Sequence, residues 1–199
     1  MTGLPAADKP RQPLPLEANR RSELVRPAAR LFVAHGYTAT STRDIADAVG
    51  MRSGSPFYHF RSKQELLKTA VIEGLQAAES ELRTAIAGVD DPAQRLRRMI
   101  RCHLDHLFAG DGQVPLLLYE VRHLDASALA EIAAIADRYQ QPWQLTLDEL
   151  AQRGSLRSSA PPLRWLLFGM LNWSSHWFRP DGELTLDDLA EAAADLLLR

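Results

Sequence analysis

Two stretches decide the fold of this chain: TRDIADAVG at residues 42–50 and FYHFRSKQELL at residues 57–67. The first predicts a short helix over 43–49, because Thr and Ser hydroxyls just before it supply an N-cap and its apolar residues share one face. Gly50 then allows a tight turn, and residues 52–58 fit a second short helix. A short helix, a glycine turn and another short helix are typical of a helix-turn-helix motif.

Helices are also expected on both sides of this motif. The apolar spacing over 20–35 predicts a helix that Gly36 ends as a C-cap. Pro27 stands inside it, so either the helix bends there or only its second half is regular. On the other side, Ser62 and Glu65 have the spacing of a capping box, which starts a long helix that continues to about residue 87.

The remainder of the chain has helical patterns as well. They cover 92–109, 115–123, 126–153, 161–178 and 185–198. Pro142 is expected to kink the longest of these helices. No segment combines alternating apolar residues with hairpin turns, so the sequence predicts an all-α fold. We divide it into a disordered, proline-rich arm at 1–19, a helix-turn-helix domain at 20–66 and a helical domain at 67–199.

Composition excludes several classes of protein. The 199 residues are 46% hydrophobic and 24% charged, which excludes a collagen-like, coiled-coil or wholly disordered chain. No apolar run reaches the roughly 18 residues of a membrane helix. The start lacks the apolar core of a signal peptide, and the single Cys102 cannot form an internal disulfide. We therefore expect a cytoplasmic protein with no membrane partner.

Charge is distributed unevenly along the chain. Residues 20–63 carry eight basic and three acidic residues, whereas residues 64–199 carry 13 basic and 20 acidic residues. A basic segment joined to an acidic body is typical of a nucleic-acid-binding module attached to another domain. A solvated basic face would have the same composition, so the motifs must decide between the two.

The stretch from Leu24 to Leu67 resembles the DNA-binding domain of the TetR family of bacterial regulators. The resemblance rests on four motifs in order: AARLF at 28–32, HGY at 35–37, TRDIADAVG at 42–50 and FYHFRSKQELL at 57–67. It implies a transcription regulator, expected to be a repressor, that binds a palindromic operator in double-stranded DNA. The alternative is a helical ligand-binding or scaffold protein whose DNA binding has degenerated, because Pro27 and Pro56 stand where the family has good helix formers.

The residues themselves suggest how DNA would be bound. Thr42 and Arg43 open the first short helix, where free N–H groups and the helix dipole attract a phosphate, and Arg43 can also reach a base edge. Residues 52–55 open the second short helix, whose N-terminal end points into the major groove in this motif. Arg52, Ser53 and Ser55 are the base-reading candidates, and Gly54 allows close approach of the backbone. Their register depends on whether Arg52 or Ser53 caps that helix.

The resemblance adds four further DNA contacts. Phe57 aligns with a family tyrosine and, without the hydroxyl, offers only an apolar contact. Tyr58 and His59 resemble the family's phosphate-binding pair, and Lys63 resembles its phosphate-binding lysine. Phosphate contacts supply affinity and position, whereas base contacts supply specificity.

The resemblance also implies that residues from about 85 onward bind a small-molecule effector and form a homodimer through apolar stripes on the last two helices. EVRHL at 120–124, FGMLNW at 168–173 and WFRPDG at 177–182 resemble a subgroup that responds to acyl-CoA thioesters in fatty-acid or steroid catabolism. Another hydrophobic effector remains the alternative. Residues that suit an apolar slot with basic groups for phosphates are Tyr119, Arg122, His123, Arg138, Trp143, Trp173 and Trp177. For the tryptophans, packing in the core or at a dimer interface is the competing role.

Three residues of metal-binding types lie close together in the sequence. His103 and His106 share one helix face, and Cys102 lies beside them. Cys102 points elsewhere and no fourth ligand is nearby, so we expect core or pocket histidines and no metal. The catalytic motifs of hydrolases and phosphate-binding loops are absent from the sequence, so we expect neither an enzyme nor a cofactor.

Overall fold

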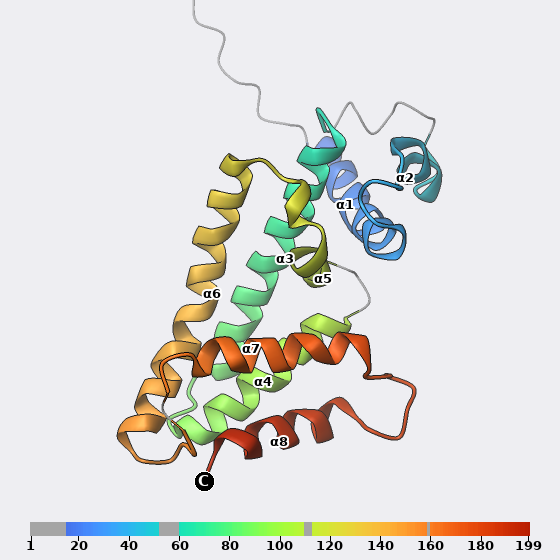
Figure 1. Cartoon of the computed structure of the whole chain (residues 1–199). Coiled ribbons are helices and arrows are strands. Elements are labelled where there is room, and N and C mark those ends of the chain that lie inside the picture. Colours follow the sequence, from blue (N-terminus) through green and yellow to red (C-terminus); the bar gives the residue numbers. More distant parts are fainter. Residues whose placement is uncertain (1–14, 52–59, 110–112, 159) are drawn as a thin grey trace, which may run out of the picture.

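The computed structural model describes residues 15–51, 60–109, 113–158 and 160–199 (Figure 1). The described residues form eight α-helices and no strand, which confirms the all-α prediction. A single β-bridge joins Leu156 to Leu198. The helices are α1 (Pro15–His35), α2 (Thr42–Ala48), α3 (Lys63–Ile86), α4 (Pro92–Phe108), α5 (Gln113–Tyr119), α6 (Ala126–Gln152), α7 (Leu163–Trp173) and α8 (Leu186–Leu197). Among the described residues, no helix is long and apolar enough to cross a membrane.

The first helix, α1, is longer than the sequence indicated. It begins at Pro15, so the last five residues of the expected disordered arm are helical. A proline is tolerated at the start of a helix, where its missing N–H has no intrahelical partner. The helix continues through Pro27 to His35, and the next residue, Gly36, has φ +82° and donates its N–H to the Phe32 carbonyl at 2.9 Å. The prediction for Gly36 as a C-cap is confirmed.

Two serine caps set the starts of α2 and α3. Ser41 Oγ accepts the Asp44 N–H at 3.1 Å, and Asp44 Oδ2 accepts the Ser41 N–H at 2.7 Å, so α2 begins at Thr42 rather than Arg43. At α3, Ser62 Oγ accepts the Glu65 N–H, but Glu65 Oε2 accepts the N–H of Arg61. In the expected capping box, the Glu65 carboxylate would accept the N–H of Ser62; here it accepts the N–H of the preceding residue, Arg61.

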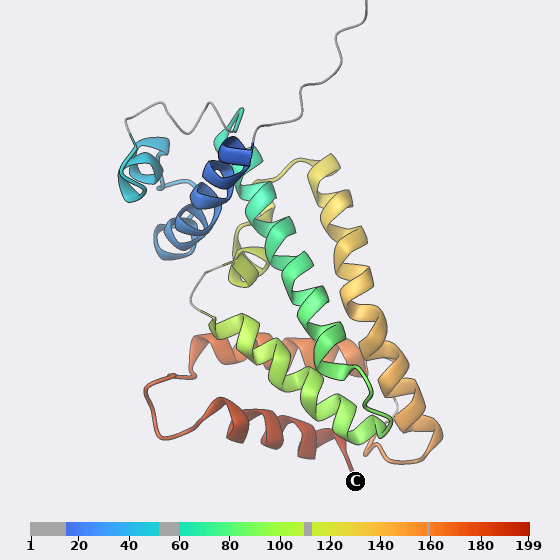
Figure 2. The same cartoon turned by 180° about the vertical axis from the view of Figure 1, so that it is seen from behind.

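Helix α3 joins the two parts of the molecule without a break (Figures 1 and 2). Its first half packs in a buried cluster with α1 and α2, and α5 and α6 complete that cluster through Leu116 and Ile132. Its second half enters another buried cluster with α4, α6, α7 and α8 through Ala78 and Leu82. The expected domain boundary between residues 66 and 67 thus falls inside α3, and the core of the helix-turn-helix part includes α5 and α6.

The C-terminal helices differ from the expected ones mainly at their ends. The expected helix at 115–123 is α5 followed by a 3₁₀ turn, η2 (Val121–His123), and the helix at 161–178 is α7 followed by η3 (Ser174–His176). Helix α6 runs unbroken through Pro142. Ion pairs of Arg97 with Glu191 and Asp195, and of Arg101 with Asp187, fasten α8 to α4.

Candidate effector pocket and DNA interface

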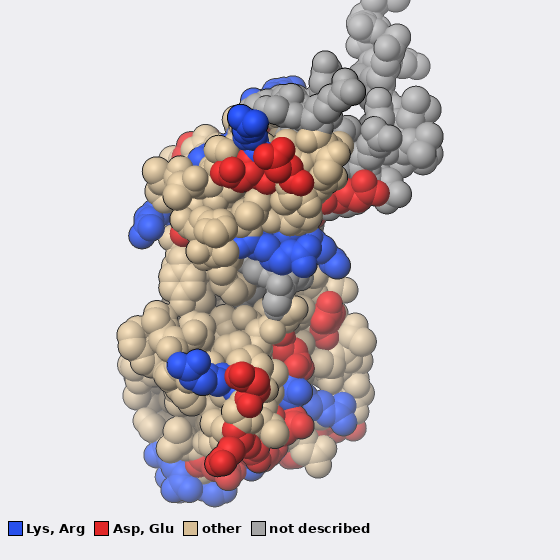
Figure 3. All heavy atoms as spheres, turned by 90° about the vertical axis from the view of Figure 1, so that its right-hand side faces the viewer, with Lys and Arg blue, Asp and Glu red and all other residues tan. Residues whose placement is uncertain are grey.

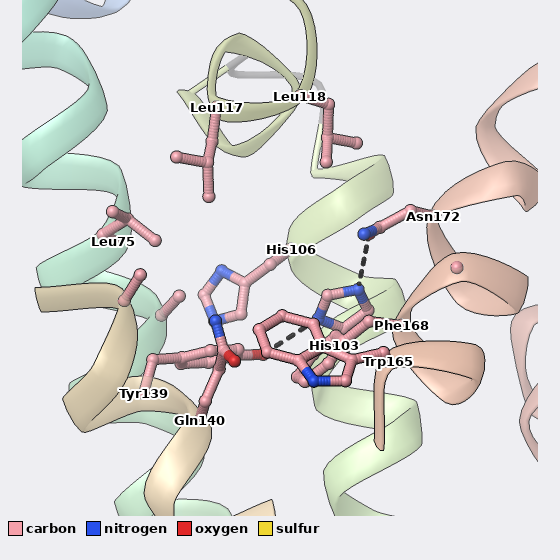
Figure 4. Close-up of a pocket in the computed structure, with 13 residues that line it drawn as sticks. Leu75, His103, His106, Leu117, Leu118, Tyr139, Gln140, Trp165, Phe168 and Asn172 are labelled. Atoms are coloured by element: carbon pink, nitrogen blue, oxygen red, sulfur yellow. Dashed lines mark hydrogen bonds between the residues drawn. The ribbon is translucent and has the colours of Figure 1, made fainter. Parts of the chain in front are cut away.

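A pocket of about 290 Å³ lies between five helices of the C-terminal part (Figure 4). Most of its wall is apolar, with Leu75 from α3, Leu117 and Leu118 from α5, and Phe168 from α7 among its members. Its polar members are His103 and His106 from α4, Tyr139 and Gln140 from α6, and Asn172 from α7. None of these described lining residues is a lysine, an arginine or a carboxylate. Such a pocket suits an apolar group with few polar atoms.

His103 is the centre of a buried hydrogen-bond chain at the base of this pocket. Its Nδ1 lies 2.9 Å from the Tyr139 hydroxyl, and its Nε2 lies 3.0 Å from Asn172 Oδ1 (Figure 4). The rings of Trp143 and Phe168 meet the imidazole edge-on. Burial lowers the pKa of His103 to about 4, so the imidazole is neutral at physiological pH.

The second histidine, His106, has a looser environment. Its Nε2 lies 3.3 Å from Glu81 Oε2, but the two atoms are not aligned as a hydrogen bond, and Nε2 has no hydrogen-bond partner among the described residues. Burial raises the pKa of the neighbouring Cys102 thiol to about 11, which makes it a poor metal ligand. Among the described residues, no cluster of three or more His, Cys, Asp or Glu could hold a metal.

The seven sequence-predicted effector residues do not line this pocket. Trp143 is fully buried behind its wall, against His103 and Phe168. The Tyr119 hydroxyl pairs with Ser175, and Arg138 pairs with Glu79. The others lie on the surface or at the junction between the two parts of the molecule: Arg122, His123, Trp173 and Trp177.

The residues that do line it had a signal in the sequence. Trp165, Phe168 and Asn172 recur at helical spacing on α7, and His103 and His106 recur three residues apart on α4. The expectation that these histidines lie in the core or in a pocket agrees with the structure. Leu117 and Leu118 had no such signal, because their position depends on where α5 packs.

The junction between the helix-turn-helix part and the pocket is polar and closely packed. The Tyr37 N–H donates to Glu120 Oε2 at 3.0 Å, and Glu120 is only 6% exposed. The His123 ring stacks on the Tyr37 ring at 4.8 Å, and Gln64 Nε2 donates to the His123 carbonyl at 2.7 Å. Lys63 Nζ lies 4.2 Å from the centre of the same Tyr37 ring.

The structure places three of the ten sequence-predicted DNA residues. Thr42 is the first residue of α2, and the Arg43 side chain is 78% exposed, with only a 4.0 Å contact to Asp47. Lys63 is engaged inside the protein, because its Nζ donates to the carbonyls of Tyr37 and Thr40 at 2.7 and 2.8 Å. The other seven lie outside the described residues: Arg52, Ser53, Gly54, Ser55, Phe57, Tyr58 and His59.

The described surface carries mixed charge. On the face shown in Figure 3, lysines and arginines alternate with acidic residues over both parts of the molecule, and residues 52–59 are among the atoms drawn in grey. The described residues on this face form no continuous basic area. Arg43 has an exposed side chain in the first turn of α2, where the sequence predicts a phosphate contact.

Helix α7 presents an apolar face to the surface. Trp165, Leu166 and Trp173 are each about 60% exposed, at 60, 63 and 62%. Gly169 stands among them, one helical turn from Trp165 and from Trp173, and a Cβ atom added at Gly169 would meet nothing within 4 Å. A face of large apolar residues around a glycine is typical of a surface that packs against another helix.

Comparison with known proteins agrees with this arrangement. The family model "Bacterial regulatory proteins, tetR family" matches residues 24–70, and the model "Tetracyclin repressor-like, C-terminal domain" matches residues 89–199. The chain is 29% identical over 185 residues to the HTH-type transcriptional repressor KstR2 of Rhodococcus jostii, covering 92% of this chain and 91% of the relative.

Two solved structures have the same fold. PfmR, a TetR family transcriptional regulator from Thermus thermophilus, has a TM-score of 0.78 and 30% identity over 88% of this chain and 97% of its own. AibR in complex with isovaleryl coenzyme A and operator DNA has a TM-score of 0.82 and 27% identity over 90% of this chain and 98% of its own. The helix-turn-helix arrangement, the two matched models and these neighbours agree, and the chain belongs to the tetR family of bacterial regulatory proteins, which are DNA-binding transcription regulators and not enzymes.

Proposed function

We propose that this protein is a repressor that binds a palindromic operator as a homodimer and is released by a small-molecule effector bound in the pocket. The observation that carries this proposal is the position of α5. Leu117 and Leu118 of α5 line the pocket, whereas Leu116 of the same helix is fully buried in the core shared with α1. One short helix thus contacts both the effector site and the DNA-binding part.

An acyl-CoA thioester is the proposed effector class. The neighbour AibR was solved with isovaleryl coenzyme A and operator DNA, and it matches nearly the whole chain. The apolar lining suits an acyl group, and we propose that the phosphates of coenzyme A lie outside the pocket, since none of its described lining residues is basic. A volume of about 290 Å³ is at the small end for ligand pockets, which favours a compact acyl group over a steroid ring system.

The proposed release depends on two dimer states with different separations of the DNA-binding parts. An effector that fits the pocket pushes on Leu117 and Leu118, and the same movement shifts Glu120, which holds the Tyr37 N–H. Tyr37 stands in the turn before α2, so its displacement moves Thr42 and Arg43. The effector then lowers operator affinity by its preference for the displaced state.

The homodimer is proposed to form through α7 and α8, as in the sequence-based hypothesis. The apolar face of Trp165, Leu166 and Trp173 on α7 supports it, and Leu196 on α8 is 65% exposed as well. Gly169 lets a second helix approach closely at the centre of that face. A two-fold dimer places its two helix-turn-helix motifs on half-sites of a palindrome.

Fluorescence anisotropy of the purified protein on DNA fragments from around its own gene tests this proposal. We expect tight binding that weakens steeply with salt and is released by one chain-length class of acyl-CoA. Binding that no ester releases would refute the effector class and retain the regulator. Absence of specific binding to every fragment would count against an operator near the gene, and a genome-wide selection of bound fragments would then decide whether the chain binds specific DNA at all.

A further inference from the structure

The hydrogen bonds at the base of the pocket fix which polar atoms remain for a ligand. Asn172 Oδ1 is an amide oxygen and can only accept, so His103 Nε2 must carry the ring proton. The neutral ring then has an unprotonated Nδ1, which accepts the Tyr139 O–H. The Tyr139 O–H is therefore donated to His103 Nδ1, and the His103 Nε2–H is donated to Asn172 Oδ1. Neither proton remains for a ligand.

The orientation of the Asn172 amide is the starting point of this chain of bonds. Its oxygen faces His103, so its two N–H groups belong to the other end of the amide, where no described residue accepts from them. Gln140 follows the same pattern, because its Oε1 accepts from Arg164. Both pocket amides have their oxygens engaged and their NH₂ groups without a described acceptor. Two amide NH₂ groups of the lining are therefore available as donors to a ligand, and the buried His106 Nε2 is a further polar atom without a hydrogen-bond partner among the described residues.

We propose that the pocket recognises the carbonyl oxygen of its effector through the Asn172 Nδ2–H, with His103 and Tyr139 as positioning residues that fix the orientation of that amide. The ligand class is a compact, uncharged acyl group whose carbonyl is the acceptor. This inference rests on the proposed function for the wider identity of the effector, but the hydrogen-bond chain stands independently of it.

The first test needs no ligand. Histidine labelled with ¹⁵N gives distinct ring-nitrogen shifts for the two neutral tautomers, and the His103 signal is assigned by its loss in His103→Phe. We expect the Nε2–H tautomer at neutral pH. The Nδ1–H tautomer would require the Asn172 amide to be reversed and would overturn the proposal.

The second test compares two ligands that differ only at the carbonyl. Isovaleryl-CoA carries the thioester oxygen, and S-isopentyl-CoA has a methylene in its place. By calorimetry we expect the thioester to bind about tenfold more tightly, which is the effect of one hydrogen bond. In Asn172→Leu this ratio should fall to about one, and Asn172→Gln should recover part of it. Leu118→Ala is the matched control, because it lowers affinity for both ligands and leaves the ratio unchanged.

The outcomes separate this inference from the proposed function. If both CoA compounds bind and Asn172→Leu keeps the full ratio, carbonyl recognition at Asn172 is refuted while the effector class stands. If neither binds, the CoA class is refuted, and the pocket is probed with 4-methylpentan-2-one and 4-methylpentan-2-amine by saturation-transfer NMR. Binding of the ketone alone, lost in Asn172→Leu, supports the inference; binding of the ammonium form, or of neither compound, overturns it.

Discussion

The N–H of Tyr37 donates to Oε2 of Glu120 at 3.0 Å, although 83 residues separate them. Glu120 is buried, and it follows directly after α5, two residues beyond the pocket-lining Leu118. Tyr37 directly follows the glycine cap of α1 and precedes α2. This hydrogen bond therefore ties the effector pocket to the element that positions Arg43.

Replacement of this carboxylate should uncouple the two sites. Glu120→Ala leaves the Tyr37 N–H without its acceptor, which should lower the free energy of unfolding by about 1–3 kcal/mol. If the contact transmits the effector signal, operator affinity of the variant should also change less on adding effector, as measured by anisotropy. Glu131→Ala is the control, because Glu131 pairs with Lys68 on the surface and its loss should cost under about 1 kcal/mol. An unchanged effector response in Glu120→Ala would remove this contact from the mechanism.

Arg43 and Lys63 should differ in their effects, although both were predicted from the sequence as phosphate contacts. Arg43 is exposed, so Arg43→Ala should weaken operator binding, reduce the slope of log K against log salt by about one and leave stability unchanged. Lys63 holds two carbonyls in the turn before α2, so Lys63→Ala should also lower the free energy of unfolding by about 1–3 kcal/mol. Urea titration and salt-dependent anisotropy measure both quantities. Equal stability of the two variants would show that the Lys63 contacts have no energetic weight.

Local capping residues in the sequence predict several helix ends of this fold correctly. Gly36 and Ser62 end and start helices as expected, because caps depend on local chemistry within a few residues. The all-α fold and the region of the long helix followed from the same local signals. The start of α1 at Pro15 differs from the expected disordered arm at 1–19, because proline content predicts disorder although a proline fits the first turn of a helix.

The pocket was harder to predict than the fold. The sequence offers Trp143, Trp173 and Trp177 for an apolar slot, with core packing or a dimer interface as the competing role; Trp173 and Trp177 lie on the surface, and Trp143 lies behind the pocket wall. Which face of a helix turns toward a cavity depends on the packing of five helices, and spacing within one helix does not determine it. Asn172 belongs to the FGMLNW motif, but the sequence does not identify it as a pocket residue. Its role depends on its contact with His103, which is 69 residues away in the chain.

His103 should make stability fall in mild acid. Its pKa is lowered to about 4 in the folded protein, from the ordinary value of 6.5, because burial disfavours the charged ring. The unfolded chain therefore binds a proton that the folded protein does not, and stability is lost as pH falls from about 6.5 to 4. The loss is about 3 kcal/mol over that window. Urea titrations at several pH values should show a shallower fall in His103→Gln than in the parent; identical curves would mean that folding does not lower the pKa of His103.

The dimer face on α7 should be sensitive to charge at its centre. In Gly169→Glu the new side chain has open space within its own protomer, so the fold should persist, but it would place a carboxylate among Trp165, Leu166 and Trp173. Burying an unpaired charge in an apolar interface costs several kcal/mol, so the dimer should dissociate into folded monomers with weakened operator binding. Light scattering after size exclusion measures the mass, and circular dichroism checks the fold. Leu129→Glu provides the control, since it adds the same charge at an exposed apolar residue of α6. A dimer that survives Gly169→Glu at micromolar concentration would place the interface elsewhere on the protein.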